Sequence, residues 1–166
     1  MSKRAKKALL FLVMLILTVL WTMLIFGFSS TDGEKSSTQS QSITQSVVRV
    51  VDPDYTMPEN PKPRSKDRVY DTIVRKTAHL GVYAVLGVLM FFTVKTLTAA
   101  GKYIFTSKLS VLFCIIIAMS DEYNQTLTSG RAGRWYDVLI DSAGVIVGTI
   151  LCIKLLKHLQ NKKLKE

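Results

Sequence analysis

Residues 8–28 read ALLFLVMLILTVLWTMLIFGF, a run of 21 residues that contains no charge and only two hydroxyl side chains, both threonines. A helix of about 20 apolar residues crosses the hydrocarbon core of a bilayer. The apolar region of a secretory signal peptide has only about 7–15 residues, so the length of this run predicts a retained anchor. This stretch places the chain in the membrane.

Three further segments, residues 77–94, 109–125 and 135–153, are also mainly apolar. The segment from 109 stays apolar only as far as Met119, so it spans the bilayer only if its helix continues through the polar residues that follow. With 48% hydrophobic residues in a 166-residue chain, the expected fold class is all-α: an integral membrane four-helix bundle forming one domain, residues 1–166. Cys114 and Cys152 both lie in apolar runs and lack the spacing of a zinc site or a disulfide framework.

The charges predict the orientation of the chain. Its net charge is +10. With four spans, the termini and the 95–108 connection share one side, which carries twelve basic residues and one acid, against ten basic residues and eleven acids on the other side. Basic residues in short segments beside spans favour the cytoplasmic side. We therefore expect cytoplasmic termini, an extracytoplasmic loop at residues 29–76, attraction to anionic lipid and no nucleic-acid binding.

The long loop contains signs of short helices. Ile43, Val47, Val50 and Val51 recur at helical spacing, which predicts an amphipathic helix on the membrane surface, although a polar tether fits the composition equally well. Prolines then interrupt any helix at positions Pro53, Pro58, Pro61 and Pro63. After them, Ser65 is a suitable N-cap, and the second span is expected to start as a surface helix that turns into the bilayer.

The ionisable residues of the spans gather at one depth. His79 lies near the start of the second span, the acids of the third lie near its end, and those of the fourth lie near its start, so antiparallel helices bring them together on the extracytoplasmic side. Charges at membrane depth usually face a partner or a water-filled cavity, which predicts an outward-facing polar pocket. The candidate ligand-binding residues are Lys76, His79, Tyr83, Ser120, Asp121, Glu122, Gln125, Arg131, Arg134, Asp137 and Asp141.

Helical spacing adds detail to this pocket. Lys76, His79 and Tyr83 share one helix face, because they are three and four residues apart. Arg131, between two glycines in the connection before the fourth span, is expected to form a salt bridge with Asp121 or Glu122. In the fourth span Gly144 and Gly148 offer a close-packing surface of the small-xxx-small type, although chance explains the pair equally well.

Four chemistries fit these residues. We favour a binding site for the head group or peptide of an envelope lipid, which needs cations and acceptors but no activated nucleophile. An intramembrane hydrolase or transferase would use His79, Asp121 or Glu122 as catalytic residues on a lipid-linked substrate. A divalent metal site is a third alternative with a weak signal, because the spans contain one histidine, His79, and no paired-histidine motif. No metal ligand is assigned. A polar network that only fixes helix register is the remaining alternative.

Several short motifs resemble the VanZ-like family of bacterial membrane proteins. They are Phe28-Ser29-Ser30, Lys76-Thr77-Ala78-His79 with Tyr83 and Gly87, Ser120-Asp121-Glu122 with Gln125, Gly130-Arg131, and Asp137 with Asp141 and Gly144. The family is named for a member associated with resistance to the glycopeptide teicoplanin. Two positions depart from its pattern: Asn124 and Asp141 stand where relatives often have histidine and asparagine, and the first departure weakens a metal site.

The resemblance implies a multi-pass protein of the bacterial cytoplasmic membrane with a role in the cell envelope. The expected partners are membrane lipid and a lipid-linked envelope precursor or a glycopeptide. The sequence leaves open whether the protein is an enzyme and how many copies assemble.

Overall fold

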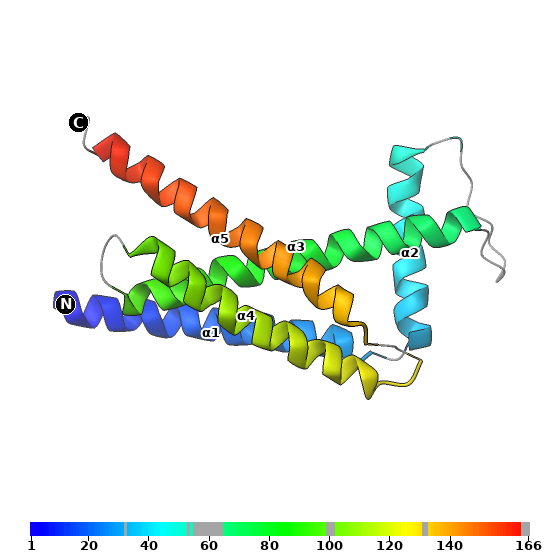
Figure 1. Ribbon diagram of the computed structural model, residues 1–166, viewed down its shortest axis with the longest axis horizontal. Helices are drawn as coiled ribbons and strands as arrows, with labels where there is room; N and C mark the ends of the chain where they lie inside the picture. The colour runs from blue at the N-terminus through cyan, green and yellow to red at the C-terminus, as the bar shows by residue number, and fades with distance from the viewer. Residues whose placement is uncertain (32, 53, 55–64, 99–101, 131–132, 164–166) are drawn as a thin grey trace.

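The structure, a computed structural model, describes residues 1–31, 33–52, 54, 65–98, 102–130 and 133–163. The described residues form helices and connections and contain no strand (Figure 1). The helices are α1 (Lys3–Ser29), α2 (Gly33–Val51), α3 (Ser65–Leu97), α4 (Tyr103–Thr126) and α5 (Trp135–Lys163).

Four of these helices, α1, α3, α4 and α5, are long and apolar enough to cross a membrane, which confirms the all-α membrane fold. The helices extend beyond the apolar segments of the sequence: α3 begins at Ser65 instead of residue 77, and α4 begins at Tyr103 instead of residue 109. A helix that has nucleated gains one hydrogen bond for each added residue, so polar flanks continue it. The predicted helix that starts at Ser65 and continues into the second span is present, because α3 is one uninterrupted helix from Ser65 to Leu97. That its first turns lie on the membrane surface stays a prediction.

The two ends of the bundle differ. α1 and α4 begin, and α3 and α5 end, on the side where Figure 1 marks the chain termini. We refer to this side as the terminal end. We refer to the opposite side, which holds Asp121, Asp137 and Asp141, as the polar end.

Close backbone contact joins α3 and α5. A Cβ atom on Gly144 would lie 2.3 Å from the carbonyl oxygen of Leu80, and one on Gly148 would lie 2.2 Å from that of Ala84. These distances are shorter than any real contact, so both positions require glycine. The small-xxx-small interpretation is therefore confirmed, and this contact sets the register between α3 and α5.

The interior of the bundle is narrow. Tyr83, Leu86, Cys114, Ala118 and Val145 form one fully buried cluster between α3, α4 and α5. By contrast, most aliphatic side chains of α1 are exposed, and Thr18, Ile25 and Ser29 are its buried residues. A bilayer accounts for this inverted pattern, because lipid covers apolar side chains as well as protein does.

α2 lies across the direction of the spans and rests on the first turns of α3 (Figure 1). Its docked face is mixed: Ser40 and Thr44 donate hydrogen bonds to Oδ1 of Asp71, and Thr44 and Val48, one helical turn apart, are both buried. Beyond its last turn, Asp52 accepts hydrogen bonds from the hydroxyl of Tyr70 at 2.7 Å and from Nζ of Lys66 at 3.1 Å. The structure therefore has a helix at Gly33–Val51, where the composition of the sequence fitted a polar tether equally well.

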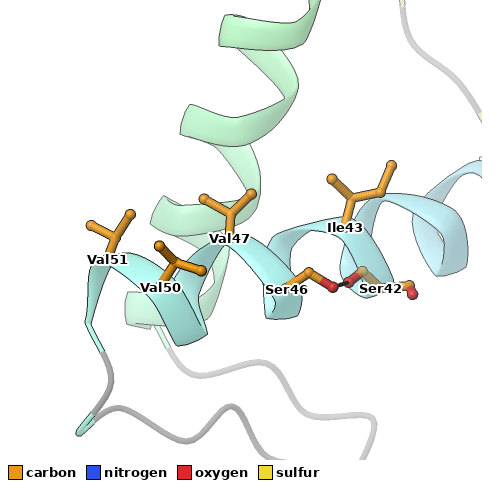
Figure 2. Close-up of a pocket in the computed structure, with 6 residues that line it drawn as sticks. All are labelled: Ser42, Ile43, Ser46, Val47, Val50 and Val51. Atoms are coloured by element: carbon orange, nitrogen blue, oxygen red, sulfur yellow. Dashed lines mark hydrogen bonds between the residues drawn. The ribbon is translucent and has the colours of Figure 1, made fainter.

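The aliphatic face of α2 is not the face that docks. Ile43, Val47, Val50 and Val51 are exposed and line a shallow groove of about 420 Å³ (Figure 2). The predicted amphipathic helix is thus present, with its apolar side turned away from the contact with α3. The prolines expected to end it, at positions 53, 58, 61 and 63, lie outside the described residues.

Candidate functional site: a polar cluster at one end of the bundle

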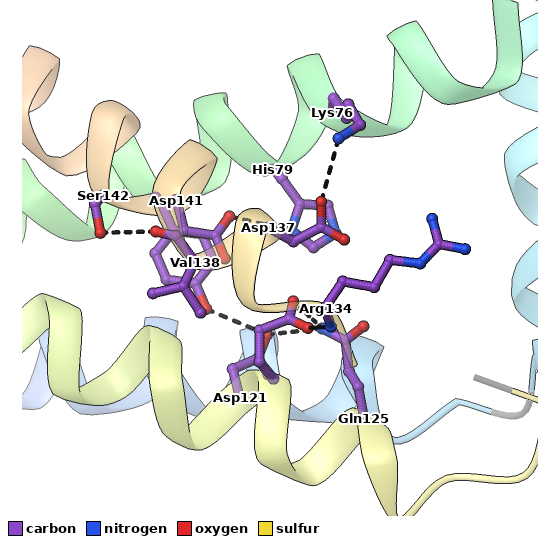
Figure 3. A network of polar contacts seen from close by, with 11 residues as sticks. Lys76, His79, Asp121, Gln125, Arg134, Asp137, Val138, Asp141 and Ser142 are labelled. Carbon is purple, nitrogen blue, oxygen red and sulfur yellow. Dashed lines mark hydrogen bonds and ion pairs between the residues drawn. The ribbon is translucent and has the colours of Figure 1, made fainter. Parts of the chain in front are cut away.

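A cluster of polar side chains joins three helices at the polar end (Figure 3). The contributors are Lys76, His79 and Tyr83 of α3, Asp121, Glu122 and Gln125 of α4, and Asp137 and Asp141 of α5. Each helix supplies residues three or four positions apart, so each presents one polar face. The antiparallel order of the helices then brings the start of α3, the end of α4 and the start of α5 together.

The contact between α3 and α5 centres on His79 and Asp141. Nδ1 of His79 lies 3.2 Å from Oδ1 of Asp141. Asp141 is fully buried, whereas 28% of the His79 side chain is exposed. The imidazole therefore connects a buried carboxylate to the outside of the bundle. A carboxylate held against one ring nitrogen orients the imidazole and leaves the other nitrogen for a ligand or for proton transfer.

A second contact joins α3 to α4 through Asp121. The hydroxyl of Tyr83 donates to Oδ2 of Asp121 at 3.2 Å, and Nε2 of Gln125 donates to the same oxygen at 3.2 Å. Asp121 is fully buried, and Tyr83 and Gln125 are buried with it. Two donors on one oxygen hold this carboxylate in a defined orientation.

Glu122 ties the connection between α4 and α5 to the cluster. Its Oε2 accepts a hydrogen bond of 2.7 Å from the backbone N–H of Arg134, and its Oε1 accepts one of 3.1 Å from Gln125. Gly133 permits this approach, since a Cβ atom there would lie 2.3 Å from the carbonyl oxygen of Glu122. The glycine before Arg134 is thus required by the close packing of the turn.

A cationic rim surrounds the buried acids. Lys76 forms an ion pair of 3.3 Å with Asp137 and also lies 4.9 Å from the centre of the Tyr136 ring. The guanidinium of Arg134 lies 5.7 Å from the same ring. Two cations therefore share one aromatic side chain, which is only partly buried, and Arg134 points away from the carboxylates in Figure 3. Cations over an aromatic face at a membrane surface suit an anionic head group.

Two buried oxygens in the cluster have no hydrogen-bond partner among the described residues: Oδ1 of Asp121 and Oδ2 of Asp141. Buried polar atoms are nearly always paired, so such atoms need an explanation. Both belong to fully buried side chains on neighbouring helices. Both oxygens are hydrogen-bond acceptors without a donor, and they lie beneath the rim formed by the cations of Lys76 and Arg134.

The other predicted residues are placed differently. Ser120 is exposed and donates to the backbone of its own helix, so it is not part of the cluster. Arg131, expected to pair with Asp121 or Glu122, lies outside the described residues, and the backbone of Arg134 contacts Glu122 instead. Sequence reasoning missed Tyr136, whose signal was the aromatic pair Trp135-Tyr136 at the start of a span, typical of a membrane interface.

The two grooves described for this structure lie away from the cluster, on α2 and between α4 and α5. Within the described ranges, no three His, Cys, Asp or Glu side chains are grouped as metal ligands. Cys114 and Cys152 are both free and buried. The chemistry of the site therefore rests on hydrogen-bond acceptors, one imidazole and a cationic rim.

These features define a class: a four-span helical membrane protein in which a buried acidic cluster at one end of the bundle joins three helices. The chain belongs to the VanZ/LLP1 family, whose model matches residues 13–157, a range that contains the cluster and most of each of the four spans. Comparison with curated proteins and with solved structures found no match. Membership of this family fits a cell-envelope membrane protein linked to teicoplanin resistance.

Proposed function

We propose that the protein binds a component of the bacterial cell envelope, a membrane lipid or lipid-linked precursor, at the polar end of the bundle. Through this binding it lowers the susceptibility of the cell to teicoplanin. The observation that carries the proposal is the pair of unpartnered carboxylate oxygens on the fully buried Asp121 and Asp141. Acids at membrane depth are costly, and a site with unused acceptors gains when a ligand brings donors.

The order of charge supports a ligand class. The acceptors of Asp121 and Asp141 lie inside, and the cations of Lys76 and Arg134 lie at the rim beside Tyr136. A ligand that fits this order has phosphate at its outer part and hydroxyl, amine or amide donors that reach inward. Phosphorylated lipid head groups and lipid-linked precursors of the envelope have both parts. His79, whose side chain is partly exposed between the two layers, serves either part through its imidazole.

The proposed orientation places the polar end outside the cell and both termini in the cytoplasm of a bacterium, following the distribution of basic residues. The test replaces Ser46 or Lys102, both exposed, by cysteine in a chain without the native Cys114 and Cys152. An impermeant maleimide applied to intact cells should label Ser46→Cys and not Lys102→Cys. The opposite result reverses the orientation.

The functional test is expression in a susceptible Gram-positive host. Wild-type protein should lower teicoplanin susceptibility more than vancomycin susceptibility, because the lipid tail of teicoplanin brings it to the membrane where the site lies. Glu122→Gln and Lys76→Gln should remove the effect at matched membrane levels, because each removes a charge that holds a polar ligand. Lys162→Ala, which changes an exposed lysine of the α5 tail, should keep it. Equal protection by all variants would exclude the polar end from the function.

The alternative is an intramembrane enzyme, a hydrolase or transferase acting on a lipid-linked envelope substrate. The contact between Nδ1 of His79 and Oδ1 of Asp141 favours it, because a base oriented by a carboxylate recurs in enzymes that activate water or a hydroxyl. An enzyme changes the covalent composition of the envelope, whereas a binding protein does not. A muropeptide or lipid species that appears on expression of the wild type and is lost with His79→Gln would establish the enzyme.

A further inference from the structure

A second site lies near the opposite end of the bundle, in a groove of about 370 Å³ between α4 and α5. We refer to it as the α4–α5 groove. Its apolar wall consists of Val111, Leu112 and Ile115 of α4 and Ile146, Ile150 and Ile153 of α5. Leu112, Ile146 and Ile150 are all about half exposed, so the groove opens on the outer surface of the bundle, where the chain meets lipid.

Two of the three polar residues of this groove lie at one end of it, and the third, Thr149 of α5, donates its hydroxyl to the carbonyl oxygen of Val145 in its own helix. Ser107 and Lys108 line the groove in the second turn of α4, nearer the terminal end than the aliphatic residues of the same helix. Lys108 is exposed and has no ion-pair partner among the described residues. A cation at the mouth of an apolar channel between two spans matches the order of groups in a phospholipid, with the phosphate outermost and the acyl chain below it.

The hydroxyl of Ser107 fits the same order. Its Oγ has no hydrogen-bond partner among the described residues, although serines in helices commonly donate to their own backbone. The atom is buried, and Ser107 is one of the residues that line the groove. A glycerol ester oxygen lies between the phosphate and the acyl chain of a lipid and is an acceptor at this level.

We propose that the α4–α5 groove binds one acyl chain of an anionic phospholipid whose phosphate pairs with Lys108. This site is separate from the polar cluster: it lies toward the terminal end, it uses other residues, and its occupant is a bulk membrane lipid. Its existence does not depend on the function proposed for the polar end. The charge of the mouth favours phosphatidylglycerol over phosphatidylcholine, since both lipids have a phosphate but only the first has a net negative charge.

The test measures lipid binding to the full-length protein in detergent by native mass spectrometry, with phosphatidylglycerol and phosphatidylcholine as probes. Wild-type protein should bind phosphatidylglycerol more tightly. Lys108→Gln should lower the phosphatidylglycerol affinity about fivefold, the effect of one lysine near an anionic surface, and leave phosphatidylcholine binding unchanged. Lys157→Gln, at an exposed lysine of α5 outside the groove, is the matched control and should change neither.

A second pair of variants tests the apolar channel. Ile150→Trp fills the groove and should lower the affinity for both lipids, whereas Val147→Trp, at an equally exposed position of α5 outside the groove, should not. The proposal is overturned if the wild type binds both lipids equally well. It is also overturned if Lys108→Gln binds phosphatidylglycerol as tightly as the wild type does. Neither result depends on whether Ile150→Trp folds. A wild-type dimer that Ile150→Trp converts to a monomer also overturns the proposal, because a second copy of the chain then occupies the groove.

Discussion

The polar residues buried near the two ends of the bundle form their hydrogen bonds in different ways. Toward the terminal end these residues are mainly hydroxyls, and several donate to a carbonyl oxygen of their own helix four residues earlier; examples are Thr93, Thr106, Ser110 and Thr149. At the polar end the buried groups are carboxylates, and their partners lie mostly on other helices, as in the pairs His79–Asp141 and Tyr83–Asp121.

The difference follows from the chemistry of the groups. A hydroxyl carries its own donor, so its helix can satisfy it before any other helix arrives. A carboxylate has only acceptors, and the N–H groups inside a helix are already used, so it needs donors from elsewhere. The helices of the terminal end therefore satisfy most of their buried hydroxyls by themselves, and contacts between helices, such as the one of 2.9 Å between the hydroxyls of Thr18 and Thr93, are additional. The polar end exists only when three helices meet, and it still leaves acceptors unused.

The largest expected effect comes from separating α3 and α5, on which the polar cluster depends. Gly144→Leu should destabilise the protein by about 3 kcal/mol, because the backbone of Leu80 occupies the space that the new side chain needs. Thermal unfolding in detergent measures it. Gly81→Leu is the matched control, since a Cβ atom at Gly81 meets nothing within 4 Å. A fully stable Gly144→Leu variant would contradict the close contact.

The next effect compares polar groups at the two ends directly. His79→Ala should cost about 1–2 kcal/mol, because it leaves the buried carboxylate of Asp141 without its partner on α3. It should also remove the proposed protection against teicoplanin. Unfolding and susceptibility are measured on the same variant, and a variant that keeps both properties would make the cluster a passive feature.

Removal of a hydroxyl near the terminal end should lower the stability of the protein less than His79→Ala does. Thr149→Val keeps the shape of the side chain and removes only hydroxyl contacts within the same helix, at 2.6 Å to the carbonyl oxygen of Val145 and at 3.1 Å to that of Ile146. Both oxygens still accept a bond of the helix backbone, so we expect a loss of about 0.5 kcal/mol or less and unchanged protection. A loss of unfolding free energy as large as that of His79→Ala would show that the stability of both ends depends equally on polar contacts.

The smallest effect concerns α2, which docks outside the bundle. The hydrogen bond from the Tyr70 hydroxyl, with that from Lys66, holds the pKa of Asp52 below its usual value. The ionised carboxyl therefore stabilises the docked helix above the unfolded pKa of about 4, and this contribution is lost as the pH falls through the lower folded pKa. Spin labels at Gln41→Cys and Arg75→Cys should report a wider distance distribution at pH 3 than at pH 7.

The matched control for this titration is Asp52→Asn, whose distance distribution should be the same at pH 3 and at pH 7. A pH response of equal size in Asp52→Asn would assign the effect to another acid at the contact between α2 and α3, such as Asp71.

Much of this molecule follows from the sequence alone. Apolar runs such as residues 8–28 determine that the chain forms membrane-spanning helices, because an unpaired backbone is too costly in lipid for any other solution. The antiparallel order of the spans follows from their number, and it places His79, Asp121 and Asp141 at one depth. Spacing along each helix also indicates which of their neighbours share a face.

Only the tertiary structure decided which of these residues meet. The pairing of His79 with Asp141 and of Tyr83 with Asp121 depends on helix rotation and tilt, which are set by contacts such as Gly144 against Leu80. Side-chain spacing within one helix carries no information about the rotation of its neighbour. The docking of α2 through the face that carries Thr44 and Val48 was equally hidden. An amphipathic pattern shows that two faces of a helix differ, but not which of them meets the protein and which meets the membrane.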